Sequence, residues 1–498
     1  MDPENKEDSS IRDLINSLPS DPVSSVLPSP ETVQNARQQL HSTIPTNGLG
    51  LRQTVDHIAR DIVPGLNHSS RSPNYYGFVT GGATPAAAYA DNIVTAFDQN
   101  VGVHLPNEAV TTDVEDRALR MLCQLLRFEP EEWPHRILTT GATASNVVGL
   151  ALGREYVVVK AAERRGGKGV SVGELGLVKA MSRAGLDDVQ ILTTVPHSSL
   201  RKAASLVGLG RDSMVDISLA REGQSHKFDL EALELALRKE RVGSIVAISC
   251  SEVNTGLFAT SGAEEMKKIR RLCDEYGAWI HVDGAFGILA RTLPQTSEYH
   301  TLTTSVDALS LADSITGDNH KLLNVPYDSG FLFSKSVPLT TSVFQNAGAA
   351  YLATSNGPDS IPSPMNIGIE NSRRFRALPL YATLLAYGVE GYSDMLVRQN
   401  GLARRIAAYI QESPAYELLP DSSSLENIYI IVLFRAAPAS LNSVLVKRIN
   451  ESRKIYVSGT EWDGVKACRF AVANWGVDVE RDFGVVKDVL EEVAKEDL

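Results

Sequence analysis

The chain has 498 residues, more than a single hydrophobic core usually serves, so we expect two or three domains. Its hydrophobic fraction of 43% and charged fraction of 22% are ordinary for a globular protein. A net charge of −12 without a basic run argues against nucleic acid or an anionic membrane surface as a partner. No apolar stretch reaches the roughly 18 residues that a membrane helix needs.

Residues 1–30 are rich in Ser, Pro, Asp and Glu, and this composition predicts a mobile N-terminal tail. The first residues are polar and acidic, unlike a secretory signal peptide or an Arg-rich transit peptide. The four cysteines are scattered, with no CxxC pair, which is typical of reduced thiols. We therefore expect a cytoplasmic protein.

Helical patterns are predicted over residues 31–43 and 51–63, within an N-terminal helical segment that we assign to residues 31–109. Their apolar faces are larger than one subunit is expected to cover, which predicts a homodimer. An aromatic and glycine-rich loop follows at residues 72–82.

A large domain is predicted over residues 110–385, where strands and helices alternate. This order predicts an α/β fold with a mainly parallel sheet, covered by helices on both faces. Residues 386–498 are predicted to form a smaller α+β domain, with strands around residues 428–434. The predicted strands of the large domain cover residues 137–140, 189–193, 244–249 and 278–282.

Two helix starts in the large domain have the spacing of a capping box. Thr112 and Glu115 form the first such pair, and Ser261 and Glu264 form the second. In a capping box each of the two side chains satisfies one free backbone amide of the first helical turn. We therefore expect both pairs to begin helices through local hydrogen bonds.

Lys321 and Asp283 are the most informative pair of residues in the chain. Asp283 ends an apolar strand, and Lys321 lies between His320 and two leucines. A lysine amine can form a Schiff base with the aldehyde of pyridoxal phosphate, while a carboxylate keeps the pyridine nitrogen protonated. Each residue alone also fits a solvent-exposed side chain, but the two in this order indicate a pyridoxal phosphate site.

Residues 141–146 join a strand to a long helix and have the composition of a phosphate-binding turn. Thr143 and Ser145 add hydroxyl donors, although a tight turn with capping residues is the alternative. His197 follows another strand, where it is either a cofactor contact or a structural histidine. Ala285 would face the same side as Asp283 and could pack on the cofactor ring.

Five segments together resemble the group II family of pyridoxal-phosphate decarboxylases, which includes the aromatic-amino-acid, glutamate, histidine and cysteine-sulfinate decarboxylases. The resemblance runs from about Ser72 to the C-terminus. Residues 318–330 resemble the family's lysine signature, with Leu322 in place of the usual Trp, and residues 281–287 resemble its aspartate signature. The other three segments are 140–146, 196–199 and 74–78.

The resemblance implies fold type I, the aspartate-aminotransferase-like fold, in an obligate dimer with shared active sites. It implies that Lys321 is the Schiff-base lysine, that Asp283 pairs with the pyridinium, and that residues 110–385 bind pyridoxal phosphate. His197 and Ala285 would lie on the two faces of the ring. The residues around the phosphate and the ring substituents would be Ala142, Thr143, Asp318 and His320, and Arg469 matches a C-terminal arginine near the active site.

We expect this enzyme to decarboxylate an L-amino acid to the amine. An aromatic substrate is suggested by Tyr75, Tyr76 and Phe78, with His104 as a candidate from the partner subunit. No metal site is expected.

Besides Leu322, two departures from the family matter, and the first of them keeps other outcomes open. Residues 353–367 correspond to the family's mobile loop but contain no Tyr to reprotonate the carbanion, and the nearest one is Tyr351. Glu252 and Val253 stand where the family usually has two threonines. The alternatives are decarboxylation coupled to oxidative deamination, another fold-type-I lyase or C–C bond reaction, and a catalytically silent binding protein.

Overall fold

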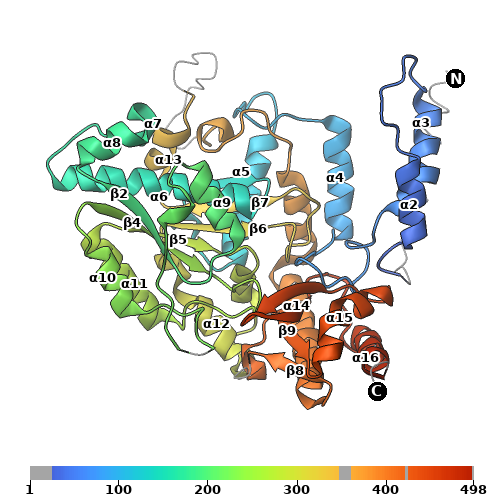
Figure 1. The fold of residues 1–498 in the computed structure, drawn as a ribbon. Coiled ribbons are helices and arrows are strands. Elements are labelled where there is room, and N and C mark those ends of the chain that lie inside the picture. Colours follow the sequence, from blue (N-terminus) through green and yellow to red (C-terminus); the bar gives the residue numbers. More distant parts are fainter. Residues whose placement is uncertain (1–24, 222, 347–360, 421–423, 496–498) are drawn as a thin grey trace.

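The computed structural model describes residues 25–221, 223–346, 361–420 and 424–495 (Figure 1). Most of the predicted N-terminal tail therefore lies outside the described residues. The same holds for residues 353–360 of the predicted loop and for Tyr351. In the described part of the chain, no helix is both long enough and apolar enough to cross a membrane.

The centre of the molecule is a seven-stranded sheet with the order β1-β7-β6-β5-β4-β2-β3. Strands β2 to β6 pair in parallel, and only β7 runs antiparallel to its two neighbours, β1 and β6. The prediction of a mainly parallel sheet is therefore confirmed. The strands are β1 (His135–Thr139), β2 (Asp188–Thr193), β3 (Met214–Asp216), β4 (Val242–Ser249), β5 (Trp279–Asp283), β6 (Ser314–Asp318) and β7 (Gly330–Ser334).

Both faces of this sheet are covered by helices. Alternate residues of each strand point to opposite sides, and apolar side chains on both sides are buried under a helical layer. In β4, Ile245 and Ala247 belong to the apolar cluster under one layer of helices, whereas Val246 and Ile248 belong to the cluster under the other. The first layer contains α6 (Ala142–Arg164), α8 (Leu177–Ala184) and α9 (Ser198–Leu206). The second contains α5 (Thr111–Leu125), α10 (Leu230–Leu237), α11 (Ala263–Tyr276) and part of α14 (Ala377–Glu412).

The C-terminal part forms a second, four-stranded antiparallel sheet with its own apolar core. Helix α14 is interrupted at Gly388, where φ is 58°, and it runs through the predicted domain boundary at residue 385. The smaller α+β unit is thus present, and its boundary stays a prediction. Its elements are β8 (Tyr416–Leu419), β9 (Ile431–Ala436), α15 (Ala439–Glu451), β10 (Ser458–Trp462), β11 (Val465–Ala471) and α16 (Val479–Lys495).

The N-terminal helices lie to one side of the body, as Figure 1 shows in blue. Helix α2 (Pro30–Gln38) begins at the capping Ser29, and α3 (Leu51–His57) continues through irregular turns to Gly65. Neither α2 nor α3 has a buried residue within the chain. Helix α4 (Pro85–Phe97) packs against α14. Shorter helices are α7 (Val172–Leu175), α12 (His300–Val306) and α13 (Val337–Phe344).

The two predicted capping boxes are wrong, although the helices themselves are present. Glu115 forms a buried ion pair with Arg373 instead of capping α5, which begins without a side-chain cap. Helix α11 likewise begins without a side-chain cap, and the amide of Ser261 donates to Glu265. At α5 a tertiary partner has replaced the local bond that the spacing predicts, whereas at α11 the bond stays local and goes to Glu265 instead of Glu264.

Candidate active site

A cavity of about 410 Å³ opens where strands β4, β5 and β6 end. The pairing of Ser249 with Asp283, and of Asp283 with Thr316, brings these strand ends to the same edge of the sheet. Ligands of open α/β sheets bind outside the carboxyl ends of the strands. The first turn of α6, the loop after β4 and Arg469 of β11 complete the cavity wall.

Lys321 lies in the turn after β6, with its amine held at the cavity wall. Its Nζ is 2.9 Å from Oδ2 of Asp318, and the other oxygen of this carboxylate accepts the amide of Ala142 at 2.5 Å. The lysine side chain is 19% exposed, whereas Asp318 is almost fully buried. The amine is therefore reachable from the cavity while its charge is neutralised by a carboxylate fixed at the start of α6.

Asp283 is held in place by a chain of hydrogen bonds that runs from it through Asn146 and His281 to Ser314. Its Oδ2 accepts Nδ2 of Asn146 at 3.0 Å, and its Oδ1 accepts the amide of Ala285 at 3.3 Å. Oδ1 of Asn146 lies 2.9 Å from Nε2 of His281, whose Nδ1 lies 2.8 Å from the hydroxyl of Ser314. Burial lowers the pKa of His281 to about 4, so this imidazole is neutral near pH 7.

His197 and Ala285 both line the cavity, and their predicted positions on the two faces of a cofactor ring stay predictions. Nδ1 of His197 accepts the amide of Ser199 at 3.2 Å and lies 2.7 Å from its hydroxyl. Because this nitrogen accepts a backbone amide, the neutral ring carries its proton on Nε2. Burial lowers the pKa of His197, while the charge of Asp283 acts in the opposite direction.

His320 forms part of the wall between Lys321 and the start of α6. Its ring stacks on Tyr327 with centroids 4.4 Å apart, and its Nδ1 accepts the amide of Ser329 at 3.2 Å. Burial is the main cause that lowers the pKa of His320. A neutral, fixed imidazole therefore lies beside the Asp318 carboxylate.

The residues present fit pyridoxal phosphate. Gly141 precedes α6 with a φ of 154° and no side-chain cap, so the first turn of the helix faces the cavity with Thr143 and Ala144 in its wall. A Cβ at Gly141 would lie 3.1 Å from Cε1 of His320, so a larger residue in this turn would have to displace the imidazole. Helix amides suit a phosphate, the Lys321 amine suits an aldehyde, and the Asp283 carboxylate suits a pyridine nitrogen.

Of Tyr75, Tyr76, Phe78 and His104, which are predicted to contact the substrate, only Phe78 lines the cavity. Phe78 lines the cavity, but Tyr75 stacks on Tyr456 at 4.5 Å and Tyr76 lies in the core of the C-terminal unit. Nδ1 of His104 bonds to a threonine hydroxyl at 2.7 Å, and His104 does not line the cavity in this chain. The substrate-binding roles of Tyr75, Tyr76 and His104 stay predictions.

Sequence reasoning missed several cavity residues. Asn146 is buried and supports Asp283 without lining the cavity; it was recognised only as part of the phosphate turn, since its bond to Asp283 joins residues 137 positions apart. Phe286 also lines the cavity, and its ring centre lies 5.7 Å from Nζ of Lys321. Its position directly after Ala285 in the sequence could have indicated that it lies near the cofactor. Other cavity residues that were not predicted include Val79, Ser199, Ser249 and Ser251.

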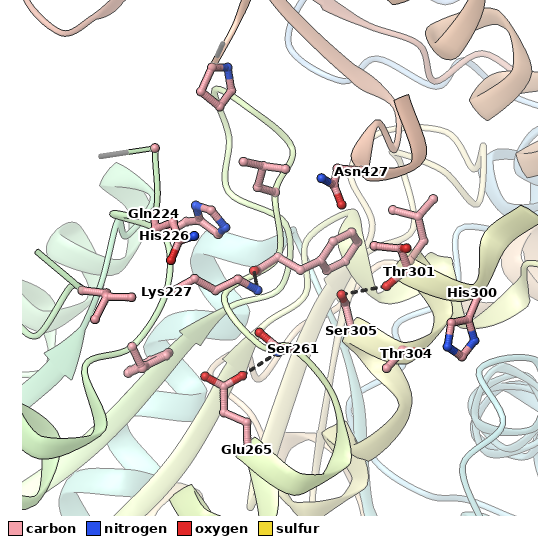
Figure 2. A pocket seen from close by; sticks show the side chains of 17 residues that line it. Gln224, His226, Lys227, Ser261, Glu265, His300, Thr301, Thr304, Ser305 and Asn427 are labelled. Atoms are coloured by element: carbon pink, nitrogen blue, oxygen red, sulfur yellow. Dashed lines mark hydrogen bonds between the residues drawn. The ribbon is translucent and has the colours of Figure 1, made fainter. Parts of the chain in front are cut away.

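A second cavity, of about 660 Å³, lies between the loop after β4 and helix α12 (Figure 2). It also contains a lysine, Lys227, but the ammonium donates to the carbonyls of Phe258 at 2.8 Å and Thr260 at 3.1 Å. Figure 2 shows Glu265 bonded to the backbone of Ser261 in the same wall. Because this ammonium is already bound by two carbonyls, and no aspartate is among the described residues that line the cavity, the second cavity does not fit the cofactor.

Comparison with known proteins gives a consistent result. Residues 33–436 match the family model described as the pyridoxal-dependent decarboxylase conserved domain. Tyrosine decarboxylase 2 of Arabidopsis thaliana is 25% identical over 449 residues, which are 88% of this chain and 76% of that protein. L-2,4-diaminobutyrate decarboxylase of Acinetobacter baumannii is 28% identical over 319 residues, 64% of this chain and 58% of that protein.

The fold also resembles that of solved structures. The crystal structure of Oryza sativa TDC with PLP and tryptamine superposes with a TM-score of 0.79 at 21% identity. The superposition covers 99% of this chain and 96% of that one. The likeness confirms the predicted fold type I architecture.

Proposed function

This chain belongs to the pyridoxal-dependent decarboxylase family, and on that premise we propose that it converts an aromatic L-amino acid into its amine and CO2. Family membership establishes the cofactor and the decarboxylation of an amino acid. The observation that supports the assignment of residues is that Lys321, Asp283 and the first turn of α6 all face one cavity.

We assign the binding of pyridoxal phosphate to these three elements. When bound, the cofactor supplies an aldehyde for the amino group and a protonated ring that accepts the electron pair released with CO2. Lys321 offers its amine to the aldehyde carbon, and the Asp283 carboxylate holds a proton on the ring nitrogen. Thr143 and the amides of the first turn of α6 after Ala142 bind the phosphate, since the amide of Ala142 donates to Asp318.

Asp318 and His320 are assigned to the neighbourhood of Lys321. The Asp318 carboxylate accepts a hydrogen bond from the ammonium, and transfer of the amine to the cofactor requires this ammonium to lose a proton. His197 and Ala285 enclose the ring from its two faces. Nε2 of His197 carries a proton on the cavity side, because Nδ1 is occupied by the amide of Ser199, and this proton is available to a carbanion.

An aromatic substrate is supported by the apolar part of the cavity wall, which includes Phe78, Val79 and Phe286. The similarity to a tyrosine decarboxylase points in the same direction, whereas that to a diaminobutyrate decarboxylase provides the competing substrate class. Incubation of the cofactor-loaded protein with single L-amino acids, followed by mass spectrometry of amine, aldehyde and ammonia, tests the proposal. We expect aromatic amino acids to give the highest rate of CO2 release.

A second outcome, an aldehyde with ammonia, is favoured by one observation. Residues 353–367 contain no Tyr, the residue expected to return a proton to the substrate carbon. A carbanion that is reprotonated slowly is exposed to oxygen for longer. The ratio of aldehyde to amine, measured in air and under nitrogen, separates the two outcomes: oxygen-dependent aldehyde supports deamination, and amine alone excludes it.

We also propose that the active enzyme is a homodimer located in the cytoplasm. Helices α2 and α3 have no buried residue in the isolated chain, and helices this short are marginal in water without tertiary packing. A partner subunit would cover them and could supply His104 to the cavity. The four cysteines are free and buried, which is compatible with a reducing compartment.

A further inference from the structure

Asn146 is fully buried, and its side chain bonds to two residues that line the cavity. Its Nδ2 donates to Oδ2 of Asp283 at 3.0 Å and to the hydroxyl of Ser199 at 3.3 Å. Its Oδ1 lies 2.9 Å from Nε2 of His281. Because a carboxylate can only accept, the NH2 group is the end of the amide that faces Asp283. The two N–H groups of one asparagine therefore serve two different parts of the cavity wall.

The second N–H group reaches His197 through the Ser199 hydroxyl. Nδ1 of His197 accepts the amide of Ser199 at 3.2 Å and lies 2.7 Å from its hydroxyl oxygen. Since this nitrogen is an acceptor, the hydroxyl donates to it, and the oxygen of the hydroxyl accepts from Asn146. The three side chains form one directed chain of hydrogen bonds, which favours the neutral imidazole with its proton on Nε2.

The start of α6 is built to bring Asn146 close to the end of β5. Gly149 lies three residues later on the same face of the helix. A Cβ at Gly149 would overlap the ring of His281, so the glycine leaves the space in which this imidazole lies beneath the helix. Asn146 thus connects the helix that we assign to the phosphate with the strand that ends at Asp283.

We propose that Asn146 is a positioning residue that orients both groups assigned to the cofactor ring, the Asp283 carboxylate and the His197 imidazole. The inference rests on the proposed function, in which these two residues lie at the ring nitrogen and on one ring face. The N–H group toward Asp283 stabilises the charged carboxylate, which in turn favours a protonated ring nitrogen. The N–H group toward Ser199 directs the hydroxyl proton to Nδ1 of His197, so the imidazole offers a donor to the cavity.

Loss of the Asn146 amide should act on both groups in a defined direction. The Asp283 carboxylate would keep one hydrogen bond within the described part of the chain, from the amide of Ala285 at 3.3 Å. Its neutral form then becomes more favourable, and it draws the proton away from the ring nitrogen. The Ser199 hydroxyl becomes free to accept from Nδ1 of His197, so the imidazole proton divides between the two nitrogens. A side chain that only filled space would change neither proton.

Both protons can be observed in the holoenzyme without substrate. We would load the protein with pyridoxal phosphate that is isotopically labelled at the ring nitrogen, label the histidines, and record nitrogen solid-state NMR spectra at neutral pH. The His197 signals are assigned by their absence in His197→Gln. In wild type we expect a protonated ring nitrogen and the Nε2–H form of His197.

Asn146→Ala should change both signals. The ring-nitrogen signal should move toward that of unprotonated pyridine, and the Nδ1–H form of His197 should appear. The affinity for the cofactor, measured by fluorescence titration, should fall about tenfold, the factor of one hydrogen bond to a charged group. Ser199→Ala removes only the link to His197, so it should change the His197 signals and leave the ring-nitrogen signal as in wild type.

Asn400→Ala is the matched control. Asn400 is also fully buried, and its NH2 group donates to the carbonyls of Ile428 at 2.8 Å and Tyr429 at 2.7 Å. It is not among the described residues that line the cavity. Asn400→Ala should therefore lose stability but leave both signals and the cofactor affinity unchanged. If it changes them as Asn146→Ala does, the effect is a general consequence of destabilisation and the inference is refuted.

The remaining outcomes separate the inference from the proposed function. Wild-type signals in Asn146→Ala, or a change of the ring-nitrogen signal alone, would refute the joint role. If Asn146→Ala does not fold, Ser199→Ala decides, because unchanged His197 signals there break the proposed link. If no amino acid releases CO2, the proposed function fails, while the two signals still show whether Asn146 sets both protons. An unprotonated ring nitrogen in the wild type would refute the role of Asp283 and this inference together.

Discussion

The side-chain amide of Asn146 donates to Oδ2 of Asp283 at 3.0 Å, which fixes the direction of a longer chain of hydrogen bonds. Since the Asn146 NH2 group faces a carboxylate, its oxygen faces His281 and requires a donor there. The neutral His281 therefore carries its proton on Nε2, and the hydroxyl of Ser314 donates to Nδ1. Ser314 in turn accepts the indole N–H of Trp279 at 2.9 Å. Asp283 is thus held as an acceptor, with a fixed orientation at the end of its strand.

The first prediction concerns the charge at this position. Asp283→Asn keeps the size of the side chain but removes the carboxylate that holds a proton on the cofactor ring. We expect a loss in kcat of about a thousandfold, or roughly 4 kcal/mol, because the ring no longer accepts the electron pair well. Steady-state kinetics with the best substrate checks this. Activity within about threefold of wild type would show that Asp283 has another role.

A buried ion pair between Arg373 and Glu115 should be essential for stability. The Arg373 side chain is 1% exposed, pairs with Glu115 at 2.8 Å, and also donates to the carbonyls of Val101 and Leu138. Arg373→Ala leaves a buried carboxylate without its partner, which costs about 3–5 kcal/mol. Urea unfolding measures this. The neighbouring Arg374 pairs with Asp91 near the surface, so Arg374→Ala should cost less than about 1 kcal/mol. Equal losses would contradict the assignment.

Stability should decline as the pH falls below the ordinary histidine range. Burial lowers the pKa of His135 from 6.5 to about 4. The unfolded chain therefore binds a proton between these values that the folded chain excludes, and stability is lost as the pH falls from about 6.5 toward 4. For this histidine the loss at about pH 5.5 is on the order of 1 kcal/mol.

The matched test compares the thermal midpoints of wild type and His135→Gln across this pH range. The variant cannot titrate at this position, so its midpoint should fall less on acidification. His41 is exposed, and His41→Gln should behave as wild type. If His135→Gln and wild type lose stability in parallel, His135 does not titrate as described.

Sedimentation of the holoenzyme should give twice the chain mass of 54.0 kDa at micromolar concentration, because α2 and α3 need a partner. Ile58 is 45% exposed in the isolated chain, and Ile58→Asp should weaken the dimer and lower the activity with it. Val178 is exposed on α8, within the large domain, and Val178→Asp should leave the mass unchanged. A fully active monomer would refute the shared active site.

The order of strands and the residues at their ends were predictable, because burial and polarity alternate locally along the chain. Asp283 and Lys321 were found at strand ends for this reason. The fate of Thr112 and Glu115 was not predictable. Their spacing fits a local cap, but Glu115 pairs with Arg373, 258 positions away.

The same limit applies to the walls of the cavity. Tyr75 and Tyr76 are aromatic residues in a loop, and nothing local shows that they pack against the C-terminal unit rather than line the site. Glu252 was visible as a departure from the family pattern. Its place beside Arg469, and the lack of a hydrogen bond to Oε2 within the described residues, depend on how the loop after β4 meets β11 in the fold.

The most direct test of the account is to identify the lysine that carries the cofactor. Borohydride reduction of the protein loaded with pyridoxal phosphate, followed by peptide mass spectrometry, should place the adduct on Lys321. Lys321→Ala should lose both the adduct and turnover while it remains folded, since among the described residues its ammonium contacts Asp318 and the Phe286 ring at the cavity wall and is not part of an apolar core. An adduct on another lysine of the wild-type protein, such as Lys227 in the second cavity, would contradict the assignment of the active site.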